Sequence, residues 1–319
     1  MTTVGKEEKN TSRFVYGPVP SRRLGISLGV DVIPFKHCSY DCIYCQLGKT
    51  THHTTERRAF VPINAVMDEI EEVVDRNDDI DYITFSGSGE PTLNSDINNM
   101  IGRIKSLTGI PVAVLTNGSL LWKEEVRRDL AQADLVVPSV DAISERVYHK
   151  INRPINGLTS RQVLEGIRLF SWEYKGRVFV EVMLVKGVND SEEEIEKINE
   201  FMHQLRVDRI QLNTVVRPPS RPDVRRLDEQ DLVRIKDLFD PSLPVEIIAG
   251  FDRTTSRAYH KDLEKAIIEL LARRPTKKDD MAVALGVHLN EIVKYLQVLE
   301  ESKKIKKAEK EGEAYYVIA

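Results

Sequence analysis

All three cysteines of this 319-residue chain lie in one short segment, Cys38-Ser-Tyr-Asp-Cys42-Ile-Tyr-Cys45. Thiolates are soft ligands that suit iron–sulfur clusters and zinc, and three of them in one loop can converge on one metal centre. In a [4Fe–4S] cluster, three protein ligands leave one iron without a thiolate, and that iron is open to a substrate or cofactor. The spacing therefore predicts an iron–sulfur centre with one open position.

A structural zinc site is the alternative use of these cysteines, and it requires a fourth ligand. His37, His52 and His53 are the nearby candidates for that ligand. A disulfide framework is not expected, because an odd cysteine count in a reduced compartment points to metal binding or reactive thiols. A chance placement of unrelated buried cysteines is the remaining alternative.

Alternating strand-like and helical patterns, from about residue 81 to residue 248, must position this segment. Apolar, β-branched runs predict buried strands, and amphipathic stretches with a period near 3.6 predict helices. About six repeats of strand then helix predict an α/β fold with a parallel sheet in a full or partial (β/α) TIM-like barrel, with its chemistry at the carboxyl ends of the strands. The predicted strands are 82–85, 112–115, 135–137, 178–185, 210–215 and 245–248, and the predicted helices are 64–75, 96–106, 123–132, 161–174, 192–205 and 229–238.

The alternation stops near Gly250, and a different pattern follows it. Helical patterns at 260–273, 276–285 and 289–301 precede a lysine-rich segment and the strand-like tail 314–319. Three helices, the last two joined by a tight turn and followed by a β wing, resemble a winged helix-turn-helix. We expect a barrel over 1–255 and a small winged helix-turn-helix domain over 256–319.

Composition argues against a secreted or membrane protein. The first 14 residues are polar and lack the apolar stretch of a secretory signal, and no apolar run approaches the roughly 20 residues that cross a bilayer. The formal net charge is -4, so the charge of the whole molecule does not steer it toward nucleic acid. We expect a cytoplasmic protein without a membrane partner.

The cysteine segment resembles the cluster loop of radical S-adenosylmethionine (radical SAM) enzymes. The resemblance implies that Cys38, Cys42 and Cys45 hold a [4Fe–4S] cluster whose fourth iron binds the amine and carboxylate of SAM. It also implies a partial barrel, a low-potential electron donor, and reductive cleavage of SAM to a 5′-deoxyadenosyl radical that abstracts hydrogen from a substrate. In such enzymes the cofactors carry the difficult step, while the protein binds and orients them.

Further family elements recur in order, each after a predicted strand. Ser86-Gly87-Ser88-Gly89-Glu90-Pro91 resembles the glycine-rich element that contacts the SAM amino group, with Ser88 inserted between the glycines. The segments 115–118 and 138–142 resemble two elements whose Thr and Ser contact SAM. Asn117 and Asp141 have the alternative of bonding their own backbone in turns. The predicted SAM contacts are Tyr44, Gly87, Ser88, Gly89, Glu90, Thr116, Asn117, Ser139, Asp141, Glu181, Met183 and Asn213.

The substrate is less well indicated. Arg22 and Arg23 in one loop, and Arg217 and Arg221 in another, flank the expected mouth, and guanidinium groups match phosphate or carboxylate. They predict an anionic substrate, unless they are ordinary solvated charges. The segment 16–25 resembles an uncharacterised group related to the wyosine-tRNA synthases, although this chain lacks the three extra cysteines of those enzymes. Nucleoside, tRNA and protein substrates stay open.

The C-terminal module is a candidate contact for nucleic acid or protein. Residues 261–319 contain 12 Lys and Arg against 11 Asp and Glu, a net charge of +1, which is far from a basic stripe. Five lysines on the predicted wing could contact phosphates, namely Lys303, Lys304, Lys306, Lys307 and Lys310. An iron–sulfur redox or iron sensor with a DNA-binding winged helix is the alternative to an enzyme. A zinc-stabilised binding protein is the third hypothesis.

Overall fold

The computed structural model describes residues 14–77, 79–216, 219, 221, 223–248, 261–273, 275–285, 287–310 and 313–319. Its main feature is one eight-stranded sheet with β1 and β10 at its two edges. Strand β1 runs antiparallel to β2, and every other neighbouring pair is parallel. In sheet order the strands are β1 (Val15–Ser21), β2 (Gly25–Val30), β5 (Tyr82–Phe85), β6 (Val112–Thr116), β7 (Leu135–Pro138), β8 (Arg177–Leu184), β9 (Arg209–Thr214) and β10 (Val245–Ile247).

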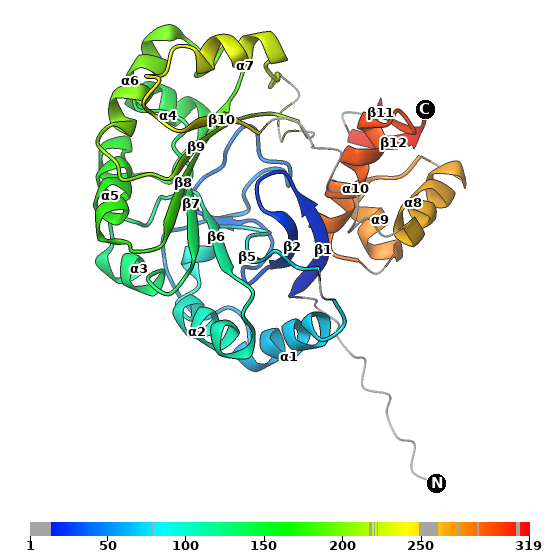
Figure 1. The fold of residues 1–319 in the computed structure, drawn as a ribbon. Helices are drawn as coiled ribbons and strands as arrows, with labels where there is room; N and C mark the ends of the chain where they lie inside the picture. Colours follow the sequence, from blue (N-terminus) through cyan, green and yellow to red (C-terminus); the bar gives the residue numbers. More distant parts are fainter. Residues whose placement is uncertain are drawn as a thin grey trace.

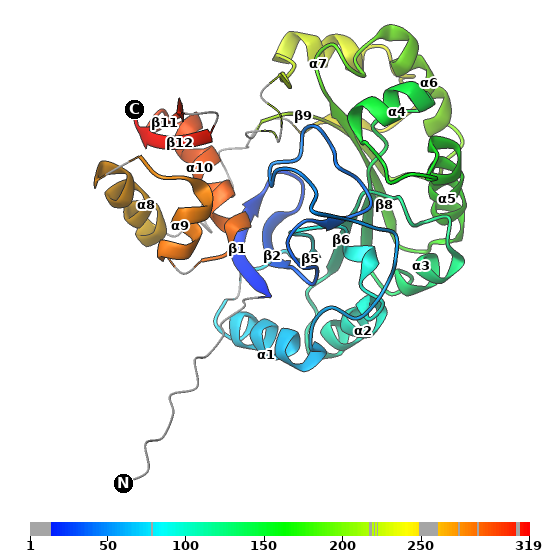
Figure 2. The ribbon, with the colours of Figure 1, turned by 180° about the vertical axis from the view of Figure 1, so that it is seen from behind.

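The sheet curves into an arc, and helices cover its outer side (Figure 1). These helices are α1 (Ile63–Val74), α2 (Ile97–Leu107), α3 (Glu124–Asp129), α4 (Glu145–Ile151), α5 (Ser160–Glu173), α6 (Glu192–Met202) and α7 (Glu229–Lys236). The long connection after β2 instead lies across the middle of the arc (Figure 2). It contains the two short strands β3 (His37–Cys38) and β4 (His52–His53), which pair in parallel. The cysteine segment therefore lies inside the incomplete barrel.

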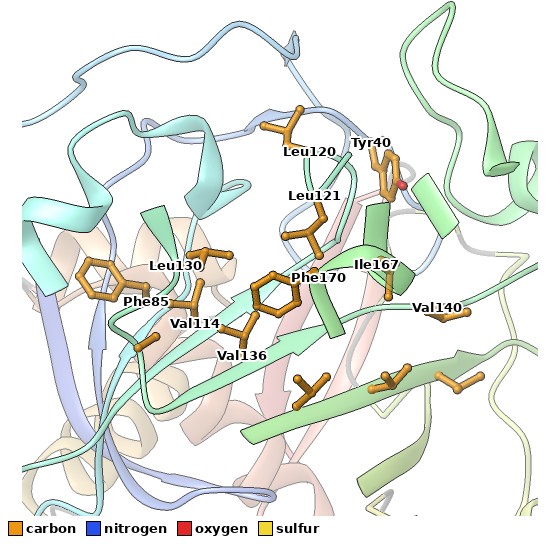
Figure 3. Close-up of a cluster of buried hydrophobic side chains, with 14 of the residues drawn as sticks. Tyr40, Phe85, Val114, Leu120, Leu121, Leu130, Val136, Val140, Ile167 and Phe170 are labelled. Carbon is orange, nitrogen blue, oxygen red and sulfur yellow. The ribbon is translucent and has the colours of Figure 1, made fainter. Parts of the chain in front are cut away.

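Apolar side chains fill the space between the sheet and its helices. Phe85, Val114 and Val136 from three neighbouring strands pack with Ile167 and Phe170 of α5 (Figure 3). All four residues of β7 are buried, as expected for a parallel strand covered on both faces. This packing fixes the strand ends from which the polar residues project.

The C-terminal residues form three helices followed by an antiparallel hairpin. The helices are α8 (Lys261–Arg273), α9 (Lys278–Leu285) and α10 (Leu289–Glu301), and the hairpin strands are β11 (Ile305–Lys310) and β12 (Glu313–Ile318). A second apolar cluster, which includes Ile267, Tyr295 and Tyr316, holds these elements together. Helix α10 packs against the edge strand β1, and both ribbon views place it there (Figures 1 and 2).

The α/β fold and all six predicted strands are confirmed within two residues at each end. The elements that the sequence did not predict include β1, β2, α4 and the two-residue strands β3 and β4. Strand β1 was missed because it contains Pro18 and Pro20, which disfavour an internal strand but are tolerated at a sheet edge. Arg22 and Arg23 therefore lie in the turn between β1 and β2.

The described helices include none that is both long enough and apolar enough to span a membrane.

Candidate active site

Each of the three cysteine sulfurs lies beside one nitrogen donor from another part of the chain. The cysteines themselves are half-buried, and none forms a disulfide. Hydrogen-bond donors of this kind stabilise a thiolate and tune a bound iron–sulfur cluster. The pairs are Lys36 Nζ to Cys45 Sγ at 3.1 Å, Asn117 Nδ2 to Cys38 Sγ at 3.5 Å, and Asn152 Nδ2 to Cys42 Sγ at 3.6 Å.

The surroundings of Cys38 and Cys42 favour the neutral form of these two thiols. Burial, together with the nearby Glu90 carboxylate, raises the pKa of Cys38 to about 12. Burial likewise raises the pKa of Cys42 well above its usual value, with Asp141 and the other two cysteines adding to the effect. A metal centre would therefore displace protons from these thiols when it binds. Three soft donors, each with a polar partner already in place, fit an iron–sulfur cluster.

The cysteines are not arranged around a single ion. Among the described residues, no group of three or more His, Cys, Asp and Glu side chains could hold one metal ion. The proposed fourth zinc ligands have other contacts, because His37 stacks on His52 at 4.1 Å and His53 Nε2 lies 2.8 Å from the Ser39 carbonyl. A [4Fe–4S] cluster differs from zinc in that each thiolate binds a different iron, so its ligands need not converge on one point.

A buried carboxylate connects the glycine-rich segment to the next strand end. Glu90 is 2% exposed and accepts hydrogen bonds from the hydroxyls of Thr92 and Thr116, both at 2.6 Å, and from the amide of Asn117 at 2.7 Å. Burial raises the pKa of Glu90, although these hydrogen bonds oppose the shift. Glu90 and Thr116 therefore bind each other and position the loops of the site.

Gly89 allows this segment to approach the cysteine loop. A Cβ atom at Gly89 would lie 1.9 Å from the carbonyl oxygen of His37, closer than any real contact. The inserted Ser88 faces Asp31, whose Oδ2 accepts from the Ser88 amide at 2.9 Å and from its hydroxyl at 2.5 Å. The insertion is thus held by a second buried carboxylate that the sequence analysis did not single out.

Asp141 joins the cysteine loop to β8. Its carboxylate accepts from Tyr44 Oη and Asn152 Nδ2, both at 2.6 Å, and from the amide of Met183 at 3.0 Å. Burial raises the pKa of Asp141 to about 6, although these hydrogen bonds lower it. The alternative that Asp141 only bonds its own turn is wrong, because its three partners come from other segments.

A cavity of about 270 Å³ opens beside the cysteine loop. The structure brings five predicted SAM contacts to its wall, together with Cys42 and Cys45. These five are Tyr44, Gly87, Glu181, Met183 and Asn213. The other predicted contacts do not line this cavity; Ser139, for example, pairs with Glu181 through the backbone. A cavity of about 640 Å³ on the outer side, beside α1 and α2, contains no cysteine and no predicted site residue.

The predicted substrate arginines separate into two groups. Arg23 forms an ion pair with Glu181, and Arg22 Nη1 donates to Asn213 Oδ1 at 2.9 Å, so both lie at the cavity. Burial alone would raise the pKa of Glu181, but the charge of Arg23 and further partners lower it overall. Arg221 instead pairs with Asp223 at the surface, at 2.8 Å. Arg217 lies outside the described residues.

Sequence reasoning missed Lys36, Asp31 and Asn152. Lys36 and Asn152 reach the cysteine sulfurs, and Asp31 holds Ser88. Lys36 offered a signal, since it is a basic residue two positions before the first cysteine. The sequence offered no such signal for Asn152, because this residue lies 110 positions after Cys42, the cysteine whose sulfur it contacts. Asn152 also follows α4, a helix that was not predicted.

A protein-family model described as the radical SAM superfamily matches residues 32–202, which include all three cysteines and the cavity-lining residues from Cys42 to Met183. This chain belongs to the radical SAM superfamily. The predicted [4Fe–4S] cluster and SAM are the cofactors of that superfamily, and membership confirms the prediction of an enzyme.

The chain is also similar to individual proteins over most of its length. It is 33% identical to a UPF0026 protein of Methanocaldococcus jannaschii, over 95% of this chain and 95% of that protein. It is 37% identical to a protein named GTPase Obg from Brachyspira hyodysenteriae, over 98% of this chain but only 46% of that protein. The structure of a radical SAM methyltransferase from Sphaerobacter thermophilus matches with a TM-score of 0.55 at 19% identity, over 72% of this chain and 67% of that one, which shows a shared fold.

Proposed function

We propose that Cys38, Cys42 and Cys45 hold the [4Fe–4S] cluster and that SAM occupies the 270 Å³ cavity beside them. The observation that carries the proposal is the placement of two of these cysteines on the wall of a cavity, with a nitrogen donor at each of the three sulfurs. When bound, these cofactors supply reductive cleavage of the SAM sulfonium and a radical that abstracts hydrogen from the substrate. An external low-potential electron donor is required.

The residues of the chain have defined tasks in this proposal. Glu181 and Asn213 present polar groups to the cavity, where they suit the ribose and amino acid parts of SAM. Tyr44, held by Asp141, presents its ring next to Cys45 and suits contact with adenine. Ser88, Gly89, Glu90, Thr116, Asn117 and Ser139 act as positioning residues, because none of them lines the cavity and each contacts other protein groups.

Uncoupled SAM cleavage tests the proposal without knowledge of the substrate. The full chain, reconstituted with iron and sulfide without oxygen, should convert SAM to 5′-deoxyadenosine when dithionite is added. The amount formed should follow the iron content of the preparation. A fully reconstituted cluster that yields none would contradict the proposal and favour an iron–sulfur sensor. A colourless preparation that binds zinc would favour the third hypothesis.

The C-terminal elements support a winged helix as a further part of the proposal. Residues 256–319 would form this domain, with the β11–β12 hairpin as the wing. Thr276, which precedes α9, pairs with Tyr316 of β12 through an isolated β-bridge. The wing lysines Lys306 and Lys307 are exposed, as contact with nucleic acid or an acidic protein requires. Salt-dependent binding of an oligonucleotide would support this interpretation, and its absence would favour a protein partner.

The proposed relation to the wyosine-tRNA synthases rests on the segment 16–25, which forms the β1–β2 hairpin beside the cavity. Its basic turn residues, Arg22 and Arg23, support an anionic substrate of the nucleoside or tRNA kind. The proposed location is the cytoplasm. Product analysis with tRNA as substrate would test the relation, and an unchanged tRNA in an otherwise active preparation would contradict it.

A further inference from the structure

A second cavity, of about 190 Å³, lies where the barrel meets helix α10. It shares four wall residues with the cofactor cavity, so the two spaces adjoin. The shared residues are Arg22, Arg23, Gln46 and Gly87. Tyr16 and Ser21 of β1 line the barrel side, and Asn290 and Lys294 of α10 line the other side. A ligand in this second cavity would therefore lie next to a molecule in the first.

Asn290 is the unusual residue of this wall. Asn290 is only 4% exposed. Among the described residues, neither the oxygen nor the nitrogen of its side-chain amide has a hydrogen-bond partner. Buried polar groups are almost always paired, because an unpaired one loses its interactions with water without compensation. An amide with both its donor and its acceptor unpaired, in a residue that lines a cavity, points to a partner that arrives with the ligand.

The charges around the cavity select the sign of the ligand. The charged residues that line it are Arg22, Arg23 and Lys294, and the described lining includes no carboxylate. Glu181, in the adjoining cavity, neutralises Arg23. Lys278 adds a positive charge near the cysteine loop, because its ammonium donates to the Gln46 carbonyl. Lys36 and Lys307 lie close enough to interact with the charge of Lys278. Together these cations favour an anion.

The C-terminal elements are held firmly enough at this position to form a wall. His288, which precedes α10, stacks on Tyr16 of β1 with ring centroids 4.8 Å apart. Its Nε2 lies 3.0 Å from the Asp31 carboxylate, the same carboxylate that holds Ser88. The position of Asn290 is thereby tied to the barrel, and through Asp31 to the glycine-rich segment.

We propose that this cavity binds a nucleotide unit of the substrate, with Asn290 contacting the base edge and Arg22 and Lys294 contacting the phosphate. A side-chain amide matches a base edge because both present one donor beside one acceptor. Guanidinium and ammonium groups match phosphate. The cavity is smaller than the adjoining cofactor cavity, so it takes one such unit and not a longer stretch of the substrate. The inference rests on the function proposed above, since the radical would form in the adjoining cavity.

Binding of ribonucleoside 5′-monophosphates to the full reconstituted chain, measured by calorimetry with SAM present, tests the proposal. At least one of the four should bind, and the matching nucleoside without phosphate should bind at least tenfold more weakly. Asn290→Leu and Lys294→Gln should each weaken binding at least tenfold. Gln297→Ala, a buried amide of α10 that bonds Glu301, and Lys306→Gln, an exposed lysine of the wing, are the matched controls and should leave binding unchanged.

Thermal unfolding separates a ligand contact from a structural role. Asn290→Leu removes an unpaired buried amide, so its melting temperature should equal or exceed that of the native chain. A lower melting temperature with unchanged nucleotide binding would overturn the assignment of Asn290. No binding of any of the four monophosphates at millimolar concentration, or binding of acidic peptides in their place, would overturn the nucleotide assignment.

Two sources can supply such a unit, and competition distinguishes them. RNA would be identified as the source if bulk tRNA or a short oligoribonucleotide displaced the monophosphate and bound at least tenfold more tightly than it. The affinity of that RNA should also fall steeply as the salt concentration rises. Equal affinities would identify a free nucleotide. Uncoupled SAM cleavage is measured separately on the same preparations. A chain that cleaves SAM but binds no nucleotide defeats only this inference, whereas a chain that binds nucleotide but cleaves no SAM defeats only the proposed function.

Discussion

The two adjoining cavities differ in how their polar groups are satisfied. Beside the cysteines, Glu90 and Asp141 are buried carboxylates that each accept three or more hydrogen bonds from protein groups. At the wall formed by α10, the buried amide of Asn290 has no described partner. The protein has thus completed one site by itself and left the other to be completed by a ligand. Cofactor sites benefit from such rigidity, because positioning is most of what the protein contributes.

Loss of one cluster ligand is the largest expected effect on the cysteine side. Cys42→Ala should abolish the brown absorbance of the reconstituted protein and the formation of 5′-deoxyadenosine together, because the chain has no fourth cysteine to replace it. Absorbance and product analysis of the same sample provide the measurement. If the variant kept both properties, the ligand assignment would be wrong.

Removal of the Glu90 carboxylate should have the next largest effect. Glu90→Ala leaves the buried hydroxyls of Thr92 and Thr116 and the amide of Asn117 without their acceptor, so the free energy of unfolding should fall by about 3 kcal/mol or more. Chemical denaturation measures it. Glu193→Ala, which removes an exposed carboxylate paired with Lys197, is the control and should change it by less than about 0.5 kcal/mol.

The Asp141 carboxyl should give the cysteine side a pH dependence. Its pKa rises from 3.8 to about 6 on folding, so the folded chain binds this proton more tightly than the unfolded chain. Its contribution to stability is therefore complete below pH 3.8 and is lost as the pH rises through about 6, a loss of up to ~3 kcal/mol. Chemical denaturation of the metal-free protein at several pH values measures this change in the free energy of unfolding. Asp141→Asn should flatten the curve between these values, and an unaltered slope would contradict the shift.

Lys36 should affect the reduction potential of the cluster but not its assembly. Its ammonium is buried 3.1 Å from Cys45 Sγ, and a positive charge there favours the reduced, more negative cluster. Lys36→Met should lower the reduction potential by roughly 100 mV, as a single charge a few ångströms away predicts. Potentiometric titration measures this shift. Lys49→Met, at an exposed lysine of the same loop, should leave the potential within error.

The smallest expected effect on stability is at Asn290, and it sharpens the contrast with Glu90. Both side chains are buried polar groups, but only Glu90 has protein partners to lose. Asn290→Ala should change the free energy of unfolding by less than about 1 kcal/mol, since the cavity that it leaves is offset by removal of an unpaired amide. Chemical denaturation of Asn290→Ala and Glu90→Ala under the same conditions compares their free energies of unfolding directly. A loss as large as that of Glu90→Ala would mean that Asn290 has a structural partner.

Much of the cofactor side could be predicted from the sequence because its residues are local in the chain. The cysteine spacing and the polar residues after each strand identify the region, and the alternating patterns identify the strands that bring them together. Partner assignment is harder, since hydrogen bonds join distant segments. Thr116 illustrates this: its place at a strand end was evident, but its bond to Glu90 depends on how two loops pack.

The side formed by α10 could not be predicted in the same way. Helix α10 itself matches the predicted range, but a periodic pattern does not say which surface a helix contacts. The contact depends on Tyr16 in β1, a strand that could not be predicted because it contains prolines. It also depends on the pairing of His288 with Asp31, two residues that are 257 positions apart in the chain. Wall residues supplied by two segments that are far apart in the sequence can be recognised only from the three-dimensional structure.

The packing of α10 on β1 also bears on how the chain can be shortened. Strand β1 ends the sheet, and the edge of a sheet offers unpaired backbone groups to any other extended chain. A version cut after residue 255 would uncover the flank of that strand and the ring of Tyr16, so it would be prone to self-association and precipitation. Trimmed versions of this protein would therefore need a solubilising change on β1 before their chemistry could be compared with that of the full chain.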